Sequence, residues 1–237
     1  MPDLKKGTDL YTSRDMPSFQ GMKAYVTPGA FVGSIRRLLL EAGFEAATTW
    51  EEADVVCFSG GSDISPTLYN EKPIPATYPD AGRDTLETVI YHHCLNNDKY
   101  MFGICRGAQF LHAMNGGRLW QDVRGHAGRD HLIVDLDDDV KILATSIHHQ
   151  MLRANNRLKI VAVTEEQISK RFEAENEVSL IASADNYEIE IEAGYYEDTG
   201  CFFVQGHPEV GSPEYRSWTM KKLHNTYSEW KQKKEAA

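Results

Sequence analysis

The chain is organised around one stretch, Tyr100-Met-Phe-Gly-Ile-Cys105-Arg-Gly-Ala-Gln-Phe-Leu111. Residues 100–104 are mostly large and apolar, which suits a short buried strand. Residues 108–114 are amphipathic at helical spacing, and the adjacent glycines at 116 and 117 are typical of a helix end. The pattern therefore predicts a strand, a sharp turn at the cysteine, and a helix.

Cys105 stands at that turn, between Gly103 and Gly107. The two glycines leave room for another segment or a substrate to approach the sulfur closely. At the first turn of a helix, the aligned backbone dipoles favour the thiolate form of a cysteine. These features predict a nucleophile elbow. The alternative, from this stretch alone, is a small core side chain, because cysteine is among the most buried residue types.

The first half of the chain alternates between strand and helix signals. Strands are predicted at residues 22–27, 44–47 and 55–58, and helices at residues 34–42 and 83–97. This alternation is typical of an α/β fold in which helices cover both faces of a parallel sheet.

The second half carries weaker signals. We expect a loop over residues 118–130, a helix over 165–175 and a strand over 187–193. In that strand the glutamates alternate with apolar residues, so we expect Glu190 and Glu192 to face solvent. A last strand over 201–205 and a final helix over 213–231 complete the pattern.

The composition restricts the class of protein. Lys plus Arg number 25 and Asp plus Glu 35, so the formal net charge is 25 − 35 = −10. An acidic chain without a basic patch is not expected to bind nucleic acid or an anionic membrane surface. No secretory signal pattern is present, and no apolar run approaches the roughly 20 residues that a membrane span needs. We therefore expect a soluble, cytoplasmic protein.

Length, proline content and the lack of a linker indicate the domain organisation. Residues 1–21 are polar, contain two prolines and have no clear period, so we expect an N-terminal arm. Residues 22–237 contain neither an internal repeat nor a low-complexity linker, and we expect them to form one domain. The four cysteines are far apart, so we expect reduced thiols and neither a disulfide framework nor a structural zinc site.

Two clusters raise the question of a metal ion. Adjacent residues of a strand point to opposite faces, so His148 and His149 are not expected to share one ion; one should face a pocket and the other should pack. The acidic run at residues 137–139 lacks the spaced ligands and glycine of a calcium loop, and we expect a solvated turn. The sequence predicts no metal and no cofactor.

The strand at residues 55–58 is followed by Ser59-Gly-Gly-Ser-Asp63. Adjacent glycines in a polar cluster are most often a plain turn. They also suit a loop whose backbone N–H groups must point at a developing negative charge without a Cβ in the way.

The segment Gln205-Gly-His207-Pro-Glu209 follows the last strand. Pro208 disfavours helical geometry at His207, and in an extended segment the side chains of His207 and Glu209 would project together. A cysteine nucleophile needs a base, and the base needs a group that orients its ring. Combined with Cys105 and the glycine loop, this segment predicts a Cys-His-Glu triad rather than a surface turn.

Together, Gly103-Ile-Cys-Arg-Gly-Ala-Gln109 and His207-Pro-Glu209 resemble the class I (triad) glutamine amidotransferases. More closely, the sequence resembles their γ-glutamyl hydrolase-like (peptidase C26-type) branch, from about residue 22 to 218. The motifs that carry this closer resemblance are Gly60-Gly-Ser-Asp-Ile-Ser-Pro-Thr-Leu-Tyr69, Arg83-Asp84, Gly116-Gly-Arg-Leu-Trp-Gln-Asp122 and His148-His-Gln150. One departure is Gly206, which stands where an aromatic residue is common.

The resemblance implies a fold and a set of roles. The fold would be a flavodoxin-like three-layer sandwich with a mostly parallel central sheet and a small antiparallel addition. Cys105 would be the nucleophile, His207 the base and Glu209 the orienting acid. The backbone N–H groups of Gly61 and Arg106 would form the oxyanion hole. The residues implied to bind the glutamyl substrate are Gly60, Asp63, Gln109, His148, His149 and Gln150.

The resemblance also implies a reaction, which is cleavage of a γ-glutamyl amide through a thioester. The chain would then be a glutaminase subunit that supplies ammonia to a synthetase partner. Two alternatives remain open: a free-standing hydrolase of γ-glutamyl amines or peptides, and a catalytically silent binding subunit on the same scaffold.

Overall fold

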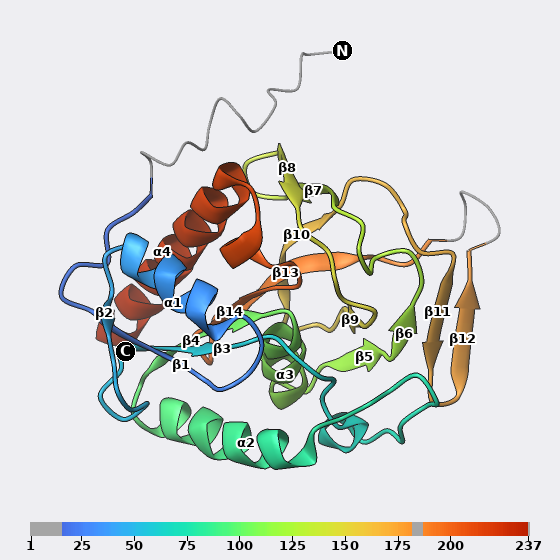
Figure 1. Ribbon diagram of the computed structural model, residues 1–237, viewed down its shortest axis with the longest axis horizontal. Helices are drawn as coiled ribbons and strands as arrows, with labels where there is room; N and C mark the ends of the chain where they lie inside the picture. Colours follow the sequence, from blue (N-terminus) through green and yellow to red (C-terminus); the bar gives the residue numbers. More distant parts are fainter. Residues whose placement is uncertain (1–15, 182–186, 237) are drawn as a thin grey trace.

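The computed structural model describes residues 16–181 and 187–236, and its centre is a large twisted sheet (Figure 1). Five strands of this sheet run parallel, in the spatial order β2-β1-β3-β4-β14. That order matches the flavodoxin-like doubly wound arrangement. The five strands are β1 (Lys23–Val26), β2 (Glu45–Ala46), β3 (Val55–Phe58), β4 (Tyr100–Ile104) and β14 (Cys201–Val204).

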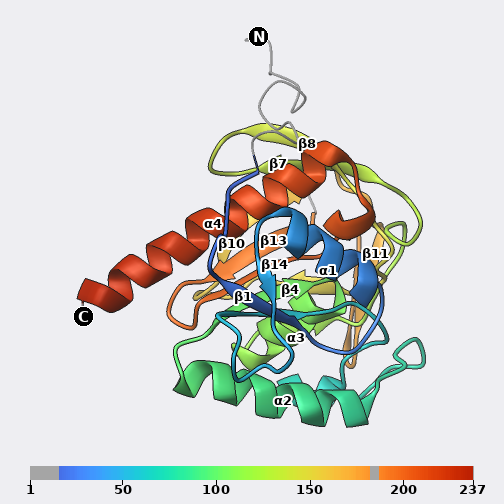
Figure 2. The same ribbon diagram turned by 60° about the vertical axis from the view of Figure 1, so that its left-hand side comes forward.

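Helices cover both faces of the parallel strands (Figures 1 and 2). The helices α1 (Val32–Glu41) and α4 (Pro213–Ala236) share one apolar core, and α2 (Ala81–Asn96) and α3 (Arg106–Met114) contribute to a second core. Every residue of β3, β4 and β14 is buried, as a parallel strand with both faces covered requires. The α/β fold class predicted from the sequence is confirmed.

Antiparallel strands extend the sheet beyond β14, in the order β13-β10-β7-β8. Their bounds are β7 (His131–Asp135), β8 (Val140–Ala144), β10 (Lys159–Thr164) and β13 (Ile191–Tyr196). Two short strands, β5 (Arg118–Trp120) and β9 (Met151–Arg153), pair beside β13. A separate small sheet has the order β12-β11-β6 and consists of β6 (Asp122–Val123), β11 (Arg171–Ala174) and β12 (Glu177–Leu180).

Two predicted elements are wrong. The expected loop over 118–130 contains β5 and β6, and the expected helix over 165–175 contains β11 instead. In β11, Phe172 and Ala174 are buried on one face, where they join a small core with Trp120 and Val123. The alternation of buried side chains is the two-residue period of a strand, which helical propensity does not override once a partner strand is present.

The prediction that Glu190 and Glu192 face solvent is also wrong. Glu190 is 2% and Glu192 is 0% exposed, whereas Tyr187 is 69% and Ile189 is 44% exposed. Ile191 and Ala193 are 0% exposed as well, so both faces of the chain are buried from residue 190 onward. Buried carboxylates need hydrogen-bonding partners, and histidines supply them here. An apolar alternation therefore does not identify the buried face when the polar residues have partners inside.

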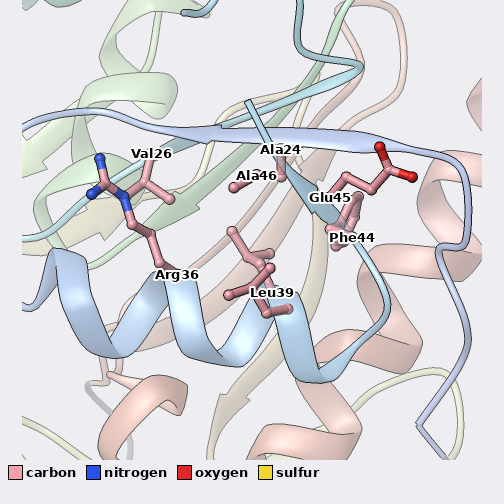
Figure 3. Close-up of a pocket in the computed structure, with 8 residues that line it drawn as sticks. Ala24, Val26, Arg36, Leu39, Phe44, Glu45 and Ala46 are labelled. Atoms are coloured by element: carbon pink, nitrogen blue, oxygen red, sulfur yellow. The ribbon is translucent and has the colours of Figure 1, made fainter. Parts of the chain in front are cut away.

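The part of the N-terminal arm that the structure describes packs against the domain. Phe19 is 2% exposed and its ring stacks on Phe44 at 4.2 Å between centroids. Figure 3 shows a small hollow nearby, where Leu39 of α1 faces Ala24 and Phe44. This hollow is mainly apolar and contains none of the residues predicted to be catalytic. Among the described helices, none combines the length and apolar character that crossing a membrane would require.

Candidate active site

Cys105 lies at a sharp turn between β4 and α3, as the sequence predicts. Its backbone has φ = 53° and ψ = −109°, a conformation that residues other than glycine rarely adopt. A Cβ at Gly107 would lie 2.0 Å from the carbonyl oxygen of Phe58, and a Cβ at Gly103 would lie 2.7 Å from the backbone of Gly107. The two glycines therefore let the turn pack against β3 and let α3 begin directly over β4.

Three neighbouring strands deliver the candidate groups to one edge of the sheet. β4 lies between β3 and β14, and all three run parallel. Their carboxyl ends lead into Gly60, Cys105 and His207, respectively. A Cβ at Gly60 would lie 2.9 Å from Cε1 of His207 and 3.7 Å from Cβ of Cys105. The glycine loop thus fits closely over both side chains.

His207 and Glu209 form a hydrogen-bonded pair. Nδ1 of His207 lies 2.7 Å from Oε1 of Glu209. The expected extended segment is not observed, because residues Pro208–Val210 form a turn of 3-10 helix. The hydroxyl of Thr145 fixes the start of this turn: it accepts from the backbone N–H of His207 at 2.8 Å and donates to the carbonyl of His207 at 2.9 Å. Thr145 is a contributor that the sequence analysis missed.

The charge state of His207 is set by its two partners. Burial alone would lower the pKa of His207, but hydrogen bonds with Cys105 and Glu209 raise this pKa to about 10. At neutral pH the imidazole therefore carries a proton. Cys105 is 7% exposed, so the pair is largely shielded from water.

The other three cysteines, Cys57, Cys94 and Cys201, are free and buried. Burial raises the pKa of Cys94 and of Cys201 to about 12, and it raises the pKa of Cys57 further above its ordinary value. These three groups stay protonated at neutral pH, so Cys105 is the candidate nucleophile.

The glycine loop is held from behind by Arg83 of α2. Its guanidinium donates to the carbonyls of Ser59 and Gly60, each at 2.7 Å, and to Glu87 at 3.0 Å. Glu87 is fully buried and also accepts from the hydroxyl of Thr27 at 2.8 Å. The loop carbonyls are therefore satisfied by a fixed charged network. The Arg83-Asp84 motif is visible in the sequence, but this function of Arg83 is not.

Arg106 contributes to the same network through its side chain. The guanidinium is fully buried and forms ion pairs with Asp84, at 2.5 Å, and with Glu87. Its side chain is therefore committed to the junction of α2 and α3. The role expected for Arg106 concerns only its backbone N–H, at the first residue of α3.

The residues expected to bind substrate divide into a partly exposed set beside the glycine loop and a buried set. Asp63 follows the glycine loop, and its carboxylate lies 3.1 Å from Nε2 of His149, whose Nδ1 lies 3.3 Å from Asp122. The hydrogen bond with Asp63 raises the pKa of His149, whose side chain is 36% exposed. His148 instead packs inside, 3% exposed, with its ring 4.7 Å from that of His126. Gln109 and Gln150 are buried.

Two further features explain how the site is bounded. Phe31 has φ = 56°, is 44% exposed, and places its ring edge-on to the ring of His207 at 5.1 Å. A Cβ at Gly206 would lie 2.5 Å from the carbonyl of Thr145 and 2.6 Å from the hydroxyl of Tyr215. Tyr215 thus occupies the space beside residue 206, which explains the glycine where an aromatic residue is common.

The fold and this edge of the sheet define a class of protein, the class I glutamine amidotransferase fold. A solved structure described as a glutamine amidotransferase from Thermotoga maritima matches with a TM-score of 0.56 over 91% of this chain and 86% of that chain, at 14% identity. At this identity the match concerns the fold alone. The chain belongs to the peptidase C26 family, whose model matches residues 38–209. The resemblance inferred from the motifs is confirmed.

Curated relatives share parts of the chain. Protein NtpR of Enterococcus hirae is 32% identical over 125 residues, which is 49% of this chain and 52% of NtpR. A Mycobacterium tuberculosis protein, named as a putative glutamine amidotransferase, is 40% identical over 74 residues, which is 30% of this chain and 24% of that protein. The chain thus spans about half of NtpR and a quarter of the second relative. Family and relatives support a function of the glutamine amidotransferase or hydrolase kind.

Proposed function

We propose that this chain cleaves the γ-glutamyl amide bond of glutamine or of a γ-glutamyl compound, with Cys105 as nucleophile, His207 as acid and base, and Glu209 as the orienting group. The observation that carries the proposal is the meeting of Cys105, at a nucleophile elbow, with His207 beneath the glycine loop, together with the His207–Glu209 hydrogen bond, whose Nδ1–Oε1 distance is 2.7 Å. The nucleophile, its base and the group that orients the base are the three parts that such catalysis needs.

The chemistry follows from these groups. The Cys105 thiolate attacks the side-chain carbonyl carbon of the glutamyl group, and the carbonyl oxygen becomes an oxyanion. Backbone N–H groups of Gly61 and Arg106 stabilise this oxyanion, each worth about a hundredfold or more in rate where such donors have been removed from other enzymes. His207 gives its proton to the departing ammonia or amine. A water molecule, activated by His207, then hydrolyses the γ-glutamyl thioester and restores the thiolate.

The rigid network behind the loop supports this assignment. Because Arg83 and Glu87 fix the carbonyls of Ser59 and Gly60, the loop does not need to reorganise when charge develops on the substrate. Asp63, which follows this loop, forms a partly exposed polar group with His149 and Asp122 from other segments. We assign this group to recognition of the charged end of the glutamyl substrate.

The first test is a substrate comparison with purified protein. We expect release of ammonia from glutamine or of amine from γ-glutamyl amides, and we expect Cys105→Ala to lower this rate by about a thousandfold or more. Cys94→Ala, which removes a buried thiol outside the site, should keep the wild-type rate. A Cys105→Ala variant with an unchanged rate would refute the mechanism. Mass spectrometry after treatment with a glutamine-analogue electrophile should find one adduct, on Cys105.

The chain has two candidate roles in the cell. As a glutaminase subunit, the chain would supply ammonia to a synthetase, and its glutamine turnover should rise when that partner is added. The second candidate, a free-standing hydrolase, is favoured because Cys105, His207 and Glu209 all come from this one chain and meet without a partner. Strong turnover of γ-glutamyl amides without any partner would select the second candidate. The presence of all three residue types of the proposed triad argues against a silent binding subunit.

A further inference from the structure

A buried cluster of histidines and glutamates lies at the start of β13 and includes no member of the candidate triad. Three imidazole nitrogens surround one oxygen, Oε1 of Glu192: Nε2 of His131 at 3.1 Å, Nδ1 of His126 at 3.4 Å and Nε2 of His148 at 3.5 Å. His126 and Glu192 are 0% exposed. The sequence analysis did not find this cluster, because its members come from separate segments and the glutamates were expected to face solvent.

The ring of His126 lies between two carboxylates. Glu190 and Glu192 are two residues apart and point the same way, so Nε2 of His126 meets Glu190 at 2.9 Å while Nδ1 meets Glu192. A neutral imidazole carries one N–H and can donate to only one of them. The other nitrogen then directs its lone pair at a carboxylate oxygen. Nδ1 of His126 is accordingly a buried atom without a hydrogen-bond partner.

The ring of His131 also faces two acceptors. Its Nδ1 lies 3.2 Å from the carbonyl oxygen of Arg129 and its Nε2 lies 3.1 Å from Glu192. Both oxygens are acceptors, so in either neutral tautomer one nitrogen faces an acceptor with its lone pair. The rings of His126 and His131 are 5.0 Å apart, so protonating both would place two cations side by side. One divalent cation among the three side chains would instead satisfy every lone pair.

The spacing suits such an ion. One ligand atom from each of His126, His131 and Glu192 can be chosen so that all three lie within 4.8 Å of one another. Zinc–nitrogen bonds of about 2.0–2.1 Å place the ligands of a tetrahedral site about 3.3 Å apart. Metal-bound histidines almost always donate their other ring N–H to a carboxylate or a backbone carbonyl. Glu190 and the carbonyl of Arg129 occupy these second positions for His126 and His131.

We propose that His126, His131 and Glu192 bind one zinc ion, with His148 as the adjoining fourth ligand. Neutral imidazole nitrogens and an anionic carboxylate oxygen are ligands that zinc accepts in proteins. Because the ligands are buried, the ion would be structural: it would join β13 to β7 and to the loop that precedes β7. None of these ligands is a proposed catalytic residue, and His148, which the resemblance implied to bind substrate, is buried in this cluster instead.

The test uses a Cys105→Ala background, because a thiolate beside His207 could itself hold zinc. Protein freed of metal by a chelator is given one equivalent of zinc sulfate, desalted and analysed for metal. We expect one zinc ion per chain, and we expect cobalt(II) in its place to show the intense visible bands of a tetrahedral ion. Zinc should also raise the melting temperature, because it binds the folded chain.

Single substitutions locate the ion. Glu192→Gln and His131→Ala should each lower zinc occupancy at least tenfold, whereas His92→Ala, which removes an exposed histidine of α2, should leave one zinc per chain. The proposal is overturned if the background protein retains no zinc, if zinc bound by the wild type is lost on Cys105→Ala, or if both cluster variants keep it. The zinc and cobalt measurements on the background protein decide the matter even where a cluster variant fails to fold.

Discussion

At the scale of single residues, unusual backbone conformations accompany the candidate catalytic groups. Cys105 and Phe31 both have positive φ values, 53° and 56°, although neither is glycine. Such conformations cost of order 1–3 kcal/mol and persist only where the surroundings enforce them. At Cys105 the conformation sets the sulfur at the start of α3, and at Phe31 it places the ring against His207.

The partner of His207 determines its protonation, which leads to a prediction about pH. The pKa of His207 is raised to about 10, so the proton needed by the leaving group is lost only as the pH rises through that value. Glu209→Gln removes one cause of the raised pKa. We expect kcat/KM to fall by about a thousandfold or more, as for the loss of other triad carboxylates, and its alkaline limb to move to lower pH. Rates measured across pH test this.

The matched control is Glu229→Gln, which makes the same chemical change at an exposed position of α4. It should leave both the rate and the pH profile unchanged. A Glu209→Gln variant whose alkaline limb stays at the wild-type pH would show that Glu209 does not set the protonation of His207.

At the scale of elements, α2 connects the sheet to the glycine loop. Asp80 caps the first turn of α2 by accepting from the backbone N–H of Arg83 at 3.0 Å, which fixes the residue that holds the loop. One turn later, Glu87 contacts β1 through Thr27 and α3 through Arg106. The helix therefore holds the loop at residues 59–61 in a fixed position relative to the sheet.

This arrangement predicts a selective effect of Arg83→Lys. A lysine keeps the charge but lacks the planar fork that reaches Ser59, Gly60 and Glu87 together. We expect kcat to fall by about tenfold to a hundredfold, because small displacements of catalytic groups have effects of that size, while KM changes less. Steady-state kinetics on the preferred substrate measure both constants.

Arg37→Lys, on the exposed side of α1, is the control and should have wild-type kinetics. An Arg83→Lys variant with an unchanged kcat would mean that the glycine loop keeps its position without the Arg83 guanidinium. A change in KM alone would also contradict a positioning role in the chemical step.

At the scale of the whole molecule, α4 links the parallel strands to the antiparallel extension. Asp135, at the end of β7, is fully buried and accepts from Nε1 of Trp218 and from Nζ of Lys222, each at 2.7 Å. Both donors come from α4. A buried carboxylate with two donors on one helix fixes the relative position of that helix and the extension.

Asp135→Asn should therefore destabilise the protein. The substitution leaves the Lys222 ammonium facing a neutral amide, with only the more exposed Asp137 and Asp138 as remaining partners. We expect the free energy of unfolding to fall by about 3 kcal/mol, the lower end of the range for breaking a buried ion pair. Urea denaturation followed by circular dichroism measures it. Asp130→Asn, at an exposed position, should shift the midpoint little; equal effects of the two variants would contradict this account.

The sequence by itself determined the features that depend on local pattern. The buried run at 55–58, the strand at 100–104 and the turn at Cys105 were predicted with their observed bounds, because short apolar runs, glycines and a following amphipathic helix are local signals. The motif residues His207 and Glu209 were also predicted as a pair, although a 3-10 turn rather than an extended segment brings them together.

Only the tertiary structure decided which side chains share a buried space. Arg83, paired with Glu87, meets the glycine loop, and Thr145 holds His207. Glu190 and Glu192 turn inward to meet histidines from other segments. The periodicity of a strand defines two faces but does not say which is buried, because partners distant in sequence can make a charged face the inner one. His126 and His131 supply those partners from the loop before β7 and from β7 itself, and they lie near Glu190 and Glu192 only in the folded chain.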